Sequence, residues 1–145
     1  MNGIIYITID QAIEIHKKTI TYSGGGTYEH FDVGRLESVL EHIQNDTYYP
    51  TFAEKITHLF FSTCKFHCFA DGNKRLAITL SAQFLLLNGY MATAKNFFNI
   101  MENISYQVAA NKIDKELLLR IMIAVLDGTY DNDEELKLDI FNAIE

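Results

Sequence analysis

The sequence has few basic residues. It contains 12 Lys and Arg against 19 Asp and Glu, so its formal net charge is −7. A protein that binds nucleic acid without sequence preference needs a basic surface that displaces counterions from the phosphates. The composition therefore argues against a direct nucleic-acid binder, while a local basic site for one phosphate group remains compatible with it.

Cysteines and long apolar runs are also scarce. The two cysteines, Cys64 and Cys68, are four residues apart and poorly placed for a disulfide framework, which favours a reducing compartment. No apolar stretch reaches the roughly 18 residues of a membrane span. The opening MNGIIYITIDQ lacks the basic region and apolar run of a signal peptide. We therefore expect a cytoplasmic protein with no membrane segment.

The remaining composition is that of a globular chain. Hydrophobic residues make up 48% of its 145 residues and charged residues 21%, with no internal repeat and no low-complexity segment. This length predicts one domain, 1–145, with a single core.

Hydrophobic periodicity predicts a mostly α-helical bundle with a small β element near the N-terminus. The β-branched run Ile4–Ile9 is typical of a short strand. Capping-box spacing at Thr8 and Gln11 then predicts a helix to about Thr21. Further helices are expected over 36–43, 52–67, 76–87, 97–108, 117–126 and 131–144.

The segment HCFADGNKR, residues 67–75, places several reactive side chains between two predicted helices. A helix N-terminus exposes unpaired backbone N–H groups and a partial positive charge, and Gly72 allows a ligand to approach the backbone. Lys74 and Arg75 add full charges for phosphate oxygens. Asp71 suits Mg²⁺ beside bound phosphates, and His67 can accept a proton from a hydroxyl. Together these groups are the parts that phosphate-transfer chemistry requires.

Simpler interpretations of the same residues stay open. Asp71 and Asn73 are also good helix caps, His67 can be a packed or surface residue, and two adjacent bases often form an ordinary solvated pair. Zinc is a further alternative, because four potential ligands lie close in sequence: Cys64, His67, Cys68 and Asp71. Structural zinc usually uses two separated ligand pairs, however, and the sequence has no second pair.

The segment resembles the Fic/Doc (filamentation/death-on-curing) motif H-P-F-x-[D/E]-G-N-[G/K]-R, with Cys68 in place of proline. The flanking sequences TFAEKITHLFFSTCKF and LAITLSAQFLLLNGY resemble the death-on-curing branch, as does SGGGTYEHFDVGRLESVLE. The resemblance covers roughly residues 5–125, and the last helix, 131–144, adds little to it. It implies an all-α Fic/Doc bundle that carries a small flap.

The resemblance also implies roles for individual residues. His67 is the expected general base, Phe69 anchors the loop, and Asp71 holds Mg²⁺. The nucleotide phosphates of ATP are expected to lie against Gly72, Asn73, Lys74 and Arg75. A flap that includes Gly24, Gly25, Gly26, Thr27 and Tyr28 is expected to hold the target peptide by strand-like pairing.

Two departures from the motif bear on the subclass. AMP-transferring relatives usually have glycine at the position of Lys74 and a second arginine at the position of Ile78. The lysine is typical of the death-on-curing branch and favours phosphoryl transfer to a Ser, Thr or Tyr hydroxyl. AMP transfer is the alternative, and a catalytically silent binding module is a third. Cys68 stands in place of a proline, so the backbone dihedral angle φ is not fixed at this position. The sequence therefore does not determine the geometry of the loop.

The resemblance further suggests protein partners. A component of translation is the expected kind of target, as in toxin–antitoxin modules. The inhibitory pattern [S/T]-x-x-x-E-[G/N] is missing, because Glu102-Asn103 has Phe98 where Ser or Thr belongs. We therefore expect inhibition in trans by a separate antitoxin protein.

Overall fold

A computed structural model gives the fold for residues 3–22, 33–66 and 73–145. These residues form seven α-helices and one short 3-10 turn, and they include no β-strand. The helices are α1 (Ile9–Tyr22), α2 (Val33–His42), α3 (Phe52–Phe66), α4 (Asn73–Leu87), α5 (Met91–Ala109), α6 (Lys115–Asp127) and α7 (Glu134–Ile144), and the turn η1 covers Tyr130–Asn132. The predicted all-α class is confirmed.

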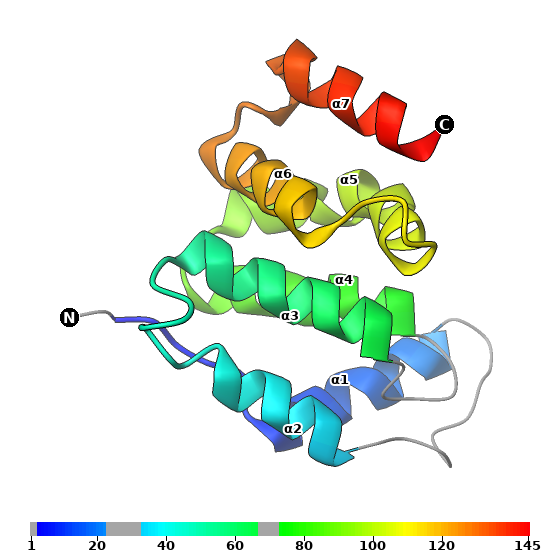
Figure 1. Ribbon diagram of the computed structural model, residues 1–145. Helices are drawn as coiled ribbons and strands as arrows, with labels where there is room; N and C mark the ends of the chain where they lie inside the picture. Colours follow the sequence, from blue (N-terminus) through cyan, green and yellow to red (C-terminus); the bar gives the residue numbers. More distant parts are fainter. Residues whose placement is uncertain (1–2, 23–32, 67–72) are drawn as a thin grey trace.

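The helices lie in layers around the pair α3 and α4 (Figure 1). Helices α1 and α2 cover one side of this pair, and α5 and α6 cover the other. Helix α7 lies outside α6 at the C-terminal end. One cluster of buried hydrophobic residues runs from Ile7 to Ile140 and includes members from all seven helices. The two central helices, which flank the motif, are therefore held from both sides.

Local capping signals fix two of the helix starts. Gln11 N donates to Thr8 Oγ1 at 3.1 Å, and Thr8 N donates to Gln11 Oε1 at 3.0 Å. Thr51 and Glu54 form the same reciprocal pair at the start of α3, with distances of 3.2 and 3.1 Å. Both predicted capping boxes are confirmed, so the entry to α3, which leads into the motif, is set by its own sequence.

Helix α4 is the buried central helix that its sequence predicts. Leu76, Leu80 and Phe84 are fully buried, and the helix contacts α1, α3 and α5. The chain leaves it through Gly89, whose φ of 88° is left-handed and suits glycine.

The strand predicted over Ile4–Ile9 is wrong. Residues 3–8 have no regular secondary structure, and Ile9 already belongs to α1. The Asn88 side-chain amide pairs with the Ile5 backbone in both directions, at 2.9 Å each, in place of a partner strand. The β-branched pattern instead belongs to an irregular, half-buried segment, in which Ile7 is buried in the core while Ile5 is exposed.

A buried lysine ties α2 to α3. Lys55 is 0% exposed, and its Nζ donates to the Ile43 carbonyl oxygen and to Asp46 Oδ1, both at 2.7 Å. The ammonium thus satisfies a backbone carbonyl just beyond the C-terminus of α2. Nothing in the sequence pattern identifies this role.

No helix in the described parts of the chain combines the length and apolar character needed to cross a membrane.

Candidate functional site

The motif lies between the end of α3 and the start of α4. Helix α3 ends at Phe66 and α4 begins at Asn73, so the structure describes both flanking helices. His67, Asp71 and Gly72 lie outside the described residues, and so do Cys68 and Phe69. The predicted flap residues also lie outside them: Gly24, Gly25, Gly26, Thr27 and Tyr28. The geometry of the site therefore comes from α4 and its neighbours.

The first turn of α4 carries two exposed cations, Lys74 and Arg75, and no acidic residue. By contrast, α1, α3, α6 and α7 each place an acidic residue in their first turn. Cations at the positive end of a helix are unfavourable by about 0.3–1 kcal/mol each at exposed positions. Neither side chain forms an ion pair with any described residue. An anion bound at this turn would complement both the side-chain charges and the partial positive charge of the helix N-terminus.

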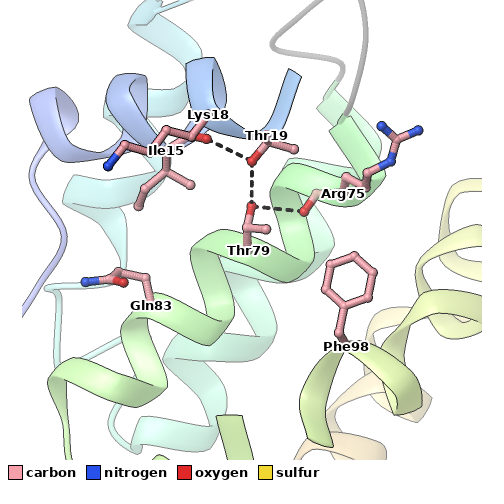
Figure 2. A pocket seen from close by; sticks show the side chains of 7 residues that line it. All are labelled: Ile15, Lys18, Thr19, Arg75, Thr79, Gln83 and Phe98. Carbon is pink, nitrogen blue, oxygen red and sulfur yellow. Dashed lines mark hydrogen bonds between the residues drawn. The ribbon is translucent and has the colours of Figure 1, made fainter. Parts of the chain in front are cut away.

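Arg75 lines a cavity of about 510 Å³ between α1, α4 and α5. Figure 2 shows its lining residues: Ile15, Lys18, Thr19, Arg75, Thr79, Gln83 and Phe98. One wall is fixed by hydroxyl contacts, because Thr79 Oγ1 lies 3.3 Å from Thr19 Oγ1 and donates to the Arg75 carbonyl oxygen at 3.0 Å. Thr19 Oγ1 in turn donates to the Ile15 carbonyl oxygen at 2.8 Å. The two threonine side chains thus meet where α1 packs against α4.

Lys74 lines a different cavity from the one that Arg75 lines. Its Nζ lies over the Tyr106 ring of α5, 5.6 Å from the centroid, which is a cation–π distance. Lys74 and Tyr106 line a cavity of about 240 Å³ together with Ala109 and Ala110. The two cations that are adjacent in sequence therefore line different cavities near the α4 N-terminus.

Ile78 belongs to the core. Its side chain is 1% exposed, and it follows two other buried residues, Leu76 and Ala77. It lines none of the cavities described here, although Thr79 beside it does. The position where AMP-transferring relatives usually carry a second arginine thus holds a buried aliphatic side chain.

Cys64, near the end of α3, is 1% exposed, and burial raises the pKa of its thiol to about 12. A thiol that stays protonated is a poor nucleophile and a poor metal ligand. No three His, Cys, Asp or Glu residues in the described parts of the chain are grouped for a metal ion. The other three residues of the zinc alternative, His67, Cys68 and Asp71, lie outside those parts.

A second polar cluster lies toward the start of α3 and was not expected from the sequence. Lys115 Nζ lies 2.8 Å from His58 Nδ1, and the Tyr49 hydroxyl lies 3.2 Å from the same atom. Burial, followed by the nearby Lys115 and His42, lowers the pKa of His58 to about 4, so the imidazole is neutral near pH 7. These residues come from separate elements, and no local pattern in the sequence brings them together.

Comparison with known proteins gives a family assignment. No curated protein matched the chain. The family model described as Fic/DOC family matches residues 6–85, a span that runs from the segment before α1 through most of α4 and includes the whole motif. Members of this family are typically enzymes that transfer nucleotide-derived groups, which supports a Fic-type transferase of the general kind. Because the match covers more than half of the chain and coincides with the all-α fold and the two basic residues at the start of α4, this protein belongs to the Fic/DOC family.

Proposed function

We propose that this protein transfers the γ-phosphoryl group of ATP to a Ser, Thr or Tyr hydroxyl of a target protein. The observation that carries the proposal is the pair of positions that differ from AMP-transferring relatives. Lys74 is an exposed cation in the first turn of α4, and Ile78 is a buried core residue. The site therefore has a lysine where a glycine would leave space, and it lacks the second arginine.

The residues of the motif divide the chemistry between them. His67 accepts the proton of the attacking hydroxyl. The backbone at Gly72 and Asn73, at the start of α4, stabilises phosphate oxygens, and Arg75 binds a second part of the phosphate chain. The cations of the α4 first turn fit such an anion because no described carboxylate neutralises them.

Asp71 would hold Mg²⁺ in this scheme. Mg²⁺ in nucleotide sites is typically bound by one or two carboxylates together with phosphate oxygens, and Asp71 is the one carboxylate of the motif. When bound, the ion neutralises charge that develops on those oxygens.

Lys74 supports phosphoryl transfer through its position. A lysine at this point adds a cation at the start of α4, where the phosphates are proposed to lie, and its ammonium lies over the Tyr106 ring of α5. The nucleotide then presents its terminal phosphate to the hydroxyl. In a relative with glycine here, the space is open and the α-phosphate can take that place.

The experiment compares the wild type with Lys74→Gly. Each protein is incubated with Mg²⁺, ATP and a cell extract, and modified peptides are identified by mass spectrometry. We expect phosphoryl groups alone from the wild type, and weaker phosphorylation with some AMP addition from the variant. AMP addition by the wild type would favour the adenylyltransferase alternative, and no modification by either would favour a silent binding module.

Control by a second protein is part of the proposal. The target, proposed to be a translation component, would pair with the flap that contains Gly24–Tyr28. An antitoxin acting in trans would bind near the flap and the motif, since no inhibitory motif occurs in the sequence. Expression of the chain alone should then slow growth, and co-expression of the protein encoded by the neighbouring gene should restore it. Normal growth with active, unpartnered protein would contradict this control.

A further inference from the structure

The cavity beside Arg75 has the position of a nucleotide subsite. Arg75, Thr79 and Gln83 line it at every fourth residue, so its wall follows about 12 Å of α4, starting in the first turn. Its volume of about 510 Å³ falls within the roughly 300–1,000 Å³ of typical small-molecule sites. A ligand whose phosphates lie at the α4 N-terminus can therefore extend into it without a break.

The lining of this cavity suits a nucleoside. Phe98 is 40% exposed, and its ring points from α5 toward Arg75 (Figure 2). Ile15 supplies an aliphatic surface on α1. The side-chain amide of Gln83, which also lines the cavity, offers two donors and an acceptor. An aromatic ring on one wall of the cavity and a polar side chain on another match the flat face and polar edge of a purine.

The cavity on the Lys74 side is a poorer fit. Its volume is about 240 Å³, below the usual range for such ligands. The Lys74 ammonium already lies over the Tyr106 ring, so this aromatic face is covered by a cation. Of these two cavities in the described part of the chain, the one beside Arg75 offers the open aromatic face.

We infer that the nucleoside of ATP occupies the cavity between α1, α4 and α5, with its base stacked on Phe98 and its edge recognised by Gln83. The inference rests on the proposed function, because it takes the phosphates to lie at the start of α4. It adds two specificity residues that lie outside the motif.

Calorimetric titrations of the full chain test this assignment in the presence of Mg²⁺. The ligands are ATP and inorganic tripolyphosphate, which has the phosphates without the nucleoside. Removing a stacking ring should raise the Kd for ATP by roughly 5- to 150-fold in Phe98→Ala, with no change for tripolyphosphate. Phe98→Tyr keeps the ring and should bind ATP within about twofold of the wild type. Tyr106→Ala removes the aromatic side chain of the other cavity and acts only through its contact with Lys74, so it should change the Kd for ATP and for tripolyphosphate by the same factor. Thermal unfolding of each variant checks the fold.

Three results would overturn the inference alone. These are unchanged ATP binding in Phe98→Ala, a loss for ATP but not for tripolyphosphate in Tyr106→Ala, and an equal loss for ATP and tripolyphosphate in Phe98→Ala. If the wild type binds neither ligand, the inference and the proposed function fail together. If ATP binding follows the expected pattern but the transferred group is AMP, the nucleoside site stands and the proposed function fails.

Discussion

Replacing Ile78 with arginine should strongly destabilise the protein. Ile78 is 1% exposed, and burial of an isoleucine side chain contributes about 1.5–3 kcal/mol to folding. A guanidinium in its place would lose that contribution, and an ion taken into a protein interior carries a penalty of several kcal/mol. We therefore expect Ile78→Arg to lower the free energy of unfolding by at least about 4 kcal/mol, a large part of the 5–15 kcal/mol of a typical domain.

Urea unfolding followed by circular dichroism measures this difference, with Ile78→Met as the matched control. Methionine keeps a long apolar side chain and should reduce the free energy of unfolding by less than about 1.5 kcal/mol. An Ile78→Arg variant within about 1 kcal/mol of the wild type would show that the arginine reaches water from this position. Position 78 could then present a cation to the site, and its burial would no longer support phosphoryl over AMP transfer.

The remaining predictions concern the motif and the second polar cluster. His67→Ala should lower the transfer rate by about 10²–10⁴ without changing thermal unfolding, and wild-type activity in it would remove His67 from the mechanism. Asp71→Ala should abolish transfer or raise the Mg²⁺ concentration needed for it. An unchanged Mg²⁺ dependence would show that Asp71 serves only as a helix cap. Because the folded-state pKa of His58 is about 4 and the usual value is about 6.5, stability should be fully present above pH 6.5 and fall as the pH drops toward 4. Urea unfolding at several pH values should show a smaller acid loss in His58→Gln, and equal losses would contradict this assignment.

The sequence predicted the helices well where local signals exist. The capping boxes at Thr8 and Thr51 set the starts of α1 and α3, and Gly128, with a φ of 76°, ends α6. Signals of this kind act within a few residues, so they can be recognised without the fold. The start of α7 was placed too early, at residue 131, because the turn η1 comes first and Asp133 is the residue that caps the helix.

Tertiary contacts explain what the sequence did not predict. The segment before α1 has the composition of a strand, yet its hydrogen-bond partner is the side chain of Asn88. Lys55 reads as a surface residue of an amphipathic helix but is fully buried against Asp46 and a backbone carbonyl. In both cases the deciding partner lies in another element of the fold.

The candidate site could be recognised in the sequence from one short motif. The side chains that surround it in the fold could not. The pattern around Lys74 and Arg75 is contiguous, so it is visible in the sequence. The aromatic residue that lines each cavity with the cation comes from α5, about 20 to 30 residues further along the chain: Tyr106 with Lys74, and Phe98 with Arg75. Only the packing of α5 against α4 shows that the two cations face different cavities.

The central proposal is tested most directly by finding which phosphorus atom of ATP is transferred to the target protein. Wild-type protein is incubated with Mg²⁺ and a cell extract in two parallel reactions, one with ATP labelled at the γ-phosphorus and one with ATP labelled at the α-phosphorus. His67→Ala serves as the blank for both. The account predicts protein-bound label from γ-labelled ATP alone, and none above the blank from α-labelled ATP. Protein-bound label from the α-phosphorus would contradict it and identify the reaction as AMP transfer.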